Sequence, residues 1–89
     1  MDKEELKLQL KKQMIEYLNL IDLSPEDIGD DDSLFDGELG LDSIDSLELI
    51  VLIEREYGIK IKSPTEGRKI LISINVMCDY IIEHSKDLS

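Results

Sequence analysis

Residues 40–58 read GLDSIDSLELIVLIEREYG, and this stretch sets the architecture expected for the chain. Asp42 is a residue type that caps helix N-termini, and Gly58 is the type that most often follows a helix C-terminus. Between them, apolar residues recur at helical spacing. The stretch therefore predicts a helix from about Asp42 to Tyr57.

The predicted helix carries two apolar stripes on opposite sides. At about 100° per residue, the stripe suited to a core contains Leu49, Ile50, Ile53 and Tyr57. The second stripe contains Ile44, Leu47 and Val51, and it is bordered by Asp45, Glu48 and Glu54. A helix of a small bundle rarely buries both sides, so we expect the second stripe to be exposed. This is typical of a docking surface, because the acids attract a basic partner and the apolar side chains make the short-range contacts.

The residues before this helix predict a longer helix and a long connection. Apolar residues at spacings of three and four indicate a helix over about residues 3–20, with Asp2 as its cap. These apolar residues are Leu6, Leu10, Met14, Leu18 and Ile21. Residues 22–41 form the connection, in which Ser24-Pro25 predicts one short helical turn. Four apolar side chains are expected to attach this connection to the core: Leu34, Phe35, Leu39 and Leu41.

The residues after it predict a short helix and a last longer one. Ser63-Pro64 begins a helix that ends near Leu71, and Gly67 weakens it by about 1 kcal/mol relative to alanine. Ser73 caps a helix over Ile74 to His84. The expected fold class is all-α, a small four-helix bundle of three longer helices and one short helix. A long loop joins its first two helices, and residues 1–89 form a single domain.

Composition narrows the range of partners. The chain has 89 residues, is 42% apolar and carries a net charge of -11, and its acids are concentrated in residues 22–56. Such a charge repels nucleic acid and anionic lipid and favours proteins with basic docking patches. The longest apolar run, Leu49–Ile53, is far shorter than the roughly 20 residues of a membrane span. With no basic segment leading into an apolar stretch at the amino terminus, we expect a cytoplasmic monomer.

Ser43 is the candidate site of modification. With Asp42 as cap, it lies in the first helical turn, where backbone N–H groups lack partners within the helix. These groups and the helix dipole would stabilise a phosphate there. A plain capping role is the alternative interpretation of this serine. Ser46 falls on the core stripe and is the poorer candidate.

The stretch LGLDSIDSLEL at residues 39–49, followed by EREYGI at residues 54–59, resembles the signature of acyl carrier proteins. The resemblance extends over roughly residues 3–83 in element order, loop length and acidity. It implies that Ser43 receives a 4'-phosphopantetheine arm from coenzyme A through a phosphopantetheinyl transferase, which would also recognise Asp42. The chain would then be a non-catalytic carrier of acyl thioesters. It would deliver them through its acidic helix to acyl-handling enzymes of fatty-acid, polyketide or specialised lipid synthesis.

The resemblance also implies a cleft for the acyl chain among the helices. Its lining would be Phe35, Ile50, Ile53, Ile61, Ile70, Met77 and Tyr80. The chain departs from the common pattern of the family at three places. Arg55 replaces an acid on the second helix, Met77 replaces a small residue on the last helix, and the segment 62–73 is longer. The chain also resembles carriers of specialised bacterial lipid or polyene pathways.

Two other functions fit parts of the pattern. A peptidyl or D-alanyl carrier would use the same serine, although such carriers are usually less acidic around it. An arm-free acidic helical protein-binding module would share the docking helix. A calcium loop fails on spacing, although Asp30–Asp32 or the acids of the second helix could hold divalent cations weakly. An enzyme has little support, because His84 is expected at the surface and Cys78 is expected inside the last helix.

Overall fold

The structure, a computed structural model, describes residues 2–35 and 40–84. Its elements are α1 (Lys3–Tyr17), the short 3₁₀ turn η1 (Pro25–Asp27), α2 (Ser43–Tyr57), α3 (Pro64–Ile70) and α4 (Ile74–His84). This is the all-α bundle of three longer helices and one short helix that the sequence predicts. The described part of the chain contains no strand.

Side-chain caps begin the helices where the sequence predicts them. The Asp2 carboxylate accepts from the backbone N–H of Glu5 at 2.8 Å at the start of α1. Ser63 Oγ accepts from the N–H of Glu66 at 3.2 Å, and Ser73 Oγ accepts from the N–H of Val76 at 3.3 Å. Each cap satisfies a backbone donor that has no partner within its helix. These helix starts are confirmed.

The first helix is shorter than predicted. It ends at Tyr17, and Asn19 adopts a left-handed φ of 56°, which turns the chain out of the helix. The prediction of a helix to residue 20 is therefore wrong. Ile21 lies beyond this turn and is 82% exposed, so its placement on the buried stripe is wrong too. The helical spacing of Ile21 has no meaning once the backbone has left the helix.

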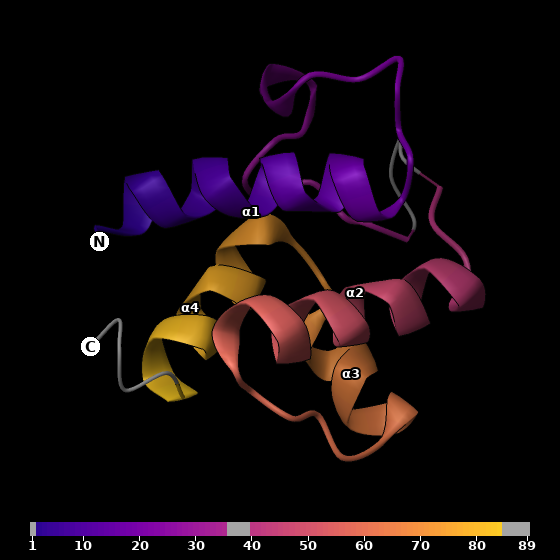
Figure 1. Cartoon of the computed structure of the whole chain (residues 1–89), viewed down its shortest axis with the longest axis vertical. Coiled ribbons are helices and arrows are strands. Elements are labelled where there is room, and N and C mark those ends of the chain that lie inside the picture. The colour runs from indigo at the N-terminus through magenta and orange to yellow at the C-terminus, as the bar shows by residue number, and fades with distance from the viewer. Residues whose placement is uncertain (1, 36–39, 85–89) are drawn as a thin grey trace.

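The helices pack around one core (Figure 1). α1 contacts both α2 and α4 and runs antiparallel to α2, while α3 contacts both α2 and α4. Each long helix contributes a row of fully buried side chains. They include Leu6, Leu10 and Met14 of α1, Leu49, Leu52 and Ile53 of α2, and Ile74, Met77, Cys78 and Ile81 of α4. Leu52 belongs to neither predicted stripe and is the residue of α2 that the helical wheel missed.

In the connection between α1 and α2, the turn η1 packs against α1 (Figure 1). Ile28, Leu34 and Leu41 are buried. The N–H of Leu34 donates to the carbonyl of Ile72 at 3.0 Å, and the N–H of Asn75 donates to the carbonyl of Asp30 at 2.9 Å. Leu39, also expected to attach this loop, lies outside the described residues. The described part of this loop is thus fixed both to the core and to the start of α4.

Candidate functional site

The first turn of α2 is the best-defined local geometry near the predicted site. The Asp42 carboxylate accepts from the N–H groups of Ile44 and Asp45, both at 3.0 Å. In return the Asp45 carboxylate accepts from the N–H of Asp42 at 3.1 Å. This reciprocal capping box fixes where the helix begins. Two early N–H groups, expected to be open to a phosphate, are therefore occupied by the cap.

Ser43 is the first residue of α2, and its side chain is exposed. It lines a pocket of about 330 Å³ together with Phe35, Leu41, Asp42, Ser46 and Arg68. These side chains come from three parts of the chain: the long loop, the start of α2 and the end of α3. Only the packing of α3 against α2 brings Arg68 to this pocket.

Ser46 is tied to Ser43 within the helix. It is half-buried, and its hydroxyl donates to the carbonyl of Ser43 at 2.7 Å. This bond holds the Ser46 hydroxyl against the helix backbone, where it is less accessible to a partner enzyme than the side chain of exposed Ser43. Of the two serines, Ser43 presents the open hydroxyl.

The second stripe of α2 is exposed. Ile44, Leu47 and Val51 are 71%, 53% and 38% exposed, while Leu49 and Ile53 on the opposite side are fully buried. Asp45 is half-buried, and Glu48 and Glu54 are exposed along the edges of the stripe. The outer side of α2 thus presents apolar side chains between acids. Its role in docking is still a prediction.

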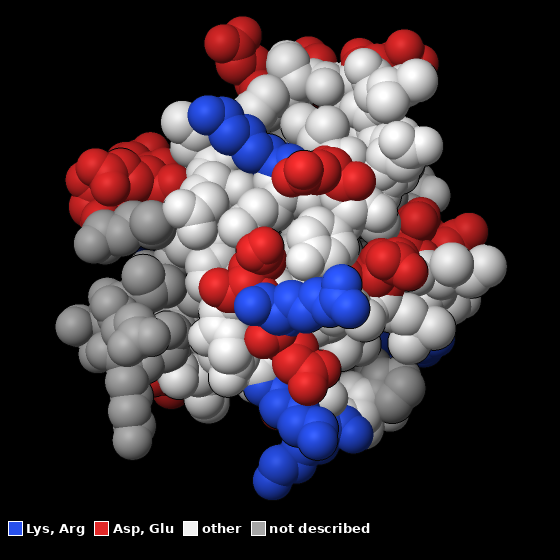
Figure 2. Space-filling view, viewed as in Figure 1, with Lys and Arg blue, Asp and Glu red and all other residues white. Residues whose placement is uncertain are grey.

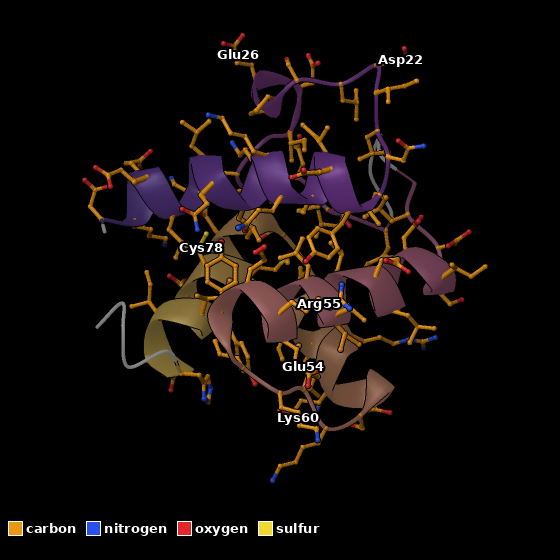
Figure 3. The ribbon with its side chains drawn as sticks, viewed as in Figure 1. Asp22, Glu26, Glu54, Arg55, Lys60 and Cys78 are labelled. Carbon is orange, nitrogen blue, oxygen red and sulfur yellow. The ribbon has the colours of Figure 1, made fainter. Side chains whose placement is uncertain are left out.

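Arg55 continues this outer side one turn beyond Val51. It is exposed, and Figure 3 labels it on α2 beside Glu54, with Lys60 on the segment that follows the helix. The same view in Figure 2 shows acidic and basic side chains interspersed over this end of the molecule. The acidic character of the α2 surface is therefore strongest at its start and weaker toward its end.

The residues predicted to line an acyl cleft are divided between the core and its edge. Ile53, Ile61, Ile70 and Met77 are buried, whereas Phe35, Ile50 and Tyr80 are half-buried. Of these, Phe35 is brought to the pocket beside Ser43. The Tyr80 ring packs on His84 with centroids 4.1 Å apart, and its hydroxyl lies 3.5 Å from Glu66 Oε1. The role of the set as an acyl cleft is still a prediction.

Two residues of the pocket were missed by reasoning from the sequence. The sequence predicts only that Leu41 attaches the loop, and it predicts no role for Arg68. Leu41 precedes Asp42 directly, so its apolar character next to the cap was an available signal. No signal in the sequence places Arg68 near Ser43, because they are separated by the whole of α2 and the following segment.

Cys78 and His84 lie where the sequence predicts them. Burial raises the pKa of the Cys78 thiol to about 11, which agrees with its predicted place inside α4. His84 is exposed, as predicted. Another pocket, of about 390 Å³, lies in the loop against Leu20, Leu23 and Ile28, and it shares no described lining residue with the Ser43 pocket.

Asp30 and Asp31 of the loop have polar partners within the protein. Asp30 pairs with Lys7 and Lys11, and the Asn75 side chain donates to Asp31. Among the described residues, no group of three or more metal-ligating side chains comes together. Asp30 is thus a poor candidate for the weak cation binding expected of Asp30–Asp32, since two ammonium groups already occupy its carboxylate. Within the same residues, no helix has the length and apolarity that crossing a membrane requires.

Comparison with known proteins places the chain in a family. The sequence model of the family described as "Phosphopantetheine attachment site" matches residues 9–65, which include Ser43 and all of α2. The chain belongs to the acyl carrier protein family. The phosphopantetheine-attachment domain of this family carries 4'-phosphopantetheine as a covalently bound group.

Individual acyl carrier proteins align with most of the chain. The acyl carrier protein of Chloroherpeton thalassium is 39% identical over 56 residues, which are 63% of this chain and 68% of that protein. The acyl carrier protein of Cyanidioschyzon merolae is 36% identical over 55 residues, or 62% of this chain and 58% of that protein. The mitochondrial acyl carrier protein of Saccharomyces cerevisiae is 34% identical over 77 residues, or 82% of this chain and 60% of that protein.

The pocket beside Ser43 fits a phosphopantetheine arm. The exposed Ser43 lines it, Phe35 and Leu41 supply apolar surface, and Ser46 and Arg68 supply polar groups. Such an arm is apolar in parts, has amides along its length and is anionic where it joins the protein. The described residues therefore offer each class of contact that the family's prosthetic group needs.

Proposed function

We propose that the chain carries acyl groups on a 4'-phosphopantetheine arm attached to Ser43. The observation that carries the proposal is the position of this serine. It is exposed at the first residue of α2, fixed by the Asp42–Asp45 capping box and open to a pocket. When bound, the arm supplies a terminal thiol that holds acyl groups as thioesters.

The chain's own residues present and orient the attachment point. Asp42 holds the first turn of α2 in place, so the Ser43 hydroxyl has a fixed direction relative to the helix. In the loading step the Ser43 oxygen forms a bond to the pantetheine phosphate of coenzyme A, the nucleotide leaves and the hydroxyl proton is released. A transferase catalyses this step, and the carrier itself is not an enzyme.

Docking of the transferase and of acyl-handling enzymes is assigned to the outer side of α2. Asp42, Asp45, Glu48 and Glu54 attract basic patches, and Ile44, Leu47 and Val51 supply the contact surface. Complementary charge accelerates encounter, while apolar contact lowers the dissociation rate. Exposure of all three apolar side chains supports this assignment, because an exposed apolar patch needs a reason.

The setting of the carrier follows from its composition and its relatives. We assign it to fatty-acid, polyketide or specialised lipid synthesis, as a single-domain monomer of the cytoplasm. Support comes from the acidic charge, which disfavours nucleic acid and membrane partners, and from the family. We place the acyl chain of the loaded carrier against the cleft residues named above, which separate from one another to admit it.

Intact mass spectrometry tests the attachment. The purified chain is incubated with coenzyme A and a broad-specificity phosphopantetheinyl transferase. Wild type and Ser46→Ala should each gain the mass of one arm, and Ser43→Ala should gain none. Ser46→Ala is the matched control, since it removes a hydroxyl of the same turn. A folded wild type that gains no mass contradicts the proposal and favours the arm-free protein-binding module.

A further inference from the structure

Arg68 stands at the pocket of Ser43 although its helix lies apart from Ser43 in the sequence. Among the described residues lining this pocket it is the one cation, and Asp42 is the one anion. Arg68 is exposed, and no hydrogen bond or ion pair engages its guanidinium in the part of the chain that the structure describes. Its charge is therefore available to a group in the pocket.

Close packing of α3 on α2 brings Arg68 to this place. At Gly67 an added Cβ would lie 3.0 Å from Ile50 Cδ1, closer than side chains normally approach. The absence of a side chain at Gly67 thus lets α3 lie directly against α2. The next residue, Arg68, then reaches the pocket at the start of α2. This gives Gly67, which weakens a helix by its flexibility, a structural reason to be there.

A phosphate on Ser43 would meet an unfavourable charge environment without a cation. The carboxylates of Asp42 and Asp45 both lie in the first turn, and the N–H groups of Ile44 and Asp45 already donate to Asp42. The helix N-terminus is consequently less available to an anion than an uncapped one. A guanidinium compensates well, because its planar fork donates two parallel hydrogen bonds to phosphate oxygens.

We propose that Arg68 is a positioning residue for the arm, and this rests on the proposed function. Its guanidinium donates to the phosphodiester oxygens on Ser43 and holds the first part of the arm over the pocket, against Phe35 and Leu41. The arm of the resting carrier is thereby directed along the α2–α3 side of the molecule. A partner enzyme that takes the arm into its own active site must break this contact.

Nuclear magnetic resonance of the loaded chain tests the contact. The chain has two arginines, Arg55 and Arg68, so the Nε–H resonance of Arg55 is an internal reference. Loading of wild type should shift the Arg68 Nε–H resonance and leave that of Arg55 in place. The ³¹P resonance of loaded Arg68→Gln should move toward that of a free phosphodiester, and high salt should move the wild-type resonance the same way. Arg68→Lys should fall between the two, because it keeps the charge and loses the fork.

Lys69→Gln is the matched control. Lys69 is the neighbouring cation in the last turn of α3, is exposed and does not line the pocket. A role limited to the helix dipole would make both substitutions act alike. Equal ³¹P resonances in wild type and Arg68→Gln, or an unmoved Arg68 Nε–H, overturn the positioning role. Intact mass is measured on the same samples, so failure of loading is distinguished as failure of the proposed function.

Discussion

Lys7 and Asp30 are 23 residues apart in the chain, and Lys7 Nζ donates to Asp30 Oδ2 at 2.8 Å. The other oxygen of the same carboxylate lies 2.6 Å from Lys11 Nζ. The Lys7 side chain is largely buried, and its charge is balanced by this partner and by Glu4. The carboxylate thus joins two turns of α1 to the middle of the long loop.

Asp30→Asn should destabilise the fold mainly at neutral pH. Hydrogen bonds from Lys11 and Lys7 lower the pKa of Asp30, so its contribution is present above the ordinary aspartate pKa of about 4. It is lost as pH falls through the lowered pKa. Pairing with Asp30 raises the pKa of Lys7, so the lysine stays charged throughout this range. We expect the midpoint of thermal unfolding to fall by about 4–8 °C at pH 7.

The pH series checks this assignment. The difference in the midpoint of thermal unfolding between Asp30→Asn and wild type should shrink below about pH 4. Asp22→Asn, which removes an exposed acid from the same loop, should change the midpoint little. A difference that is the same at all pH values would show that the carboxylate charge does not stabilise the loop.

Tyr57→Phe should loosen the contact between α1 and α2. The Tyr57 hydroxyl donates to Gln13 Oε1 at 2.5 Å and accepts from Gln9 Nε2 at 3.2 Å. Removing it should lower the free energy of unfolding by about 1 kcal/mol. Tyr17→Phe is the control, since its hydroxyl has no hydrogen bond among the described residues. Urea unfolding measures the free energy of unfolding of both variants. Equal decreases would show that the Tyr57 hydroxyl does not stabilise the contact between α1 and α2.

Gly67→Ala should depend on the residue at position 50. Alanine favours the helix by about 1 kcal/mol, but its Cβ would lie 3.0 Å from Ile50 Cδ1. We expect little net change in wild type and a gain in the Ile50→Val background, which lacks that methyl. A double-mutant cycle by urea unfolding measures the coupling. Zero coupling would show that α3 does not approach α2 closely at Gly67.

Leu47→Ala should weaken docking without unfolding the chain. If the exposed Leu47 side chain contributes about 1.4 kcal/mol to transferase binding, its loss lowers kcat/KM of the transferase about tenfold. Leu8→Ala is the matched control, because Leu8 is a similarly exposed leucine on α1. The kinetics are measured with the carrier as the varied substrate. Equal effects of the two substitutions on kcat/KM would show that α2 is not part of the docking surface.

Cys78 should be inert in the native chain. Burial holds the pKa of its thiol near 11, so at pH 8 only about one thiol in a thousand is ionised. The native unloaded chain should take up no alkylating reagent, and the chain in urea should take up one equivalent. The loaded native chain should take up one equivalent at the arm. Labelling of Cys78 in the native unloaded chain would show that α4 opens readily.

Local sequence patterns were sufficient to predict that the helices exist and where each one begins. Caps are decided within a few residues, so Asp2, Asp42, Ser63 and Ser73 were predicted correctly from the sequence. The buried and exposed sides of α2 could be predicted from helical periodicity together with the small size of the chain. The prediction for Ile21 was wrong because periodicity does not reveal where the backbone leaves a helix. Here the backbone leaves α1 at Asn19.

Contacts between distant segments needed the tertiary structure. The pairing of Asp30 with Lys7 and Lys11, the burial of Leu52 and the approach of Arg68 to Ser43 depend on how helices pack. Side chains far apart in sequence meet only when loop paths and helix positions are fixed together. The sequence alone therefore determined which serine stands at the helix start. The tertiary structure alone decided which cation stands beside it, because that choice depends on the close packing of α3 against α2 at Gly67.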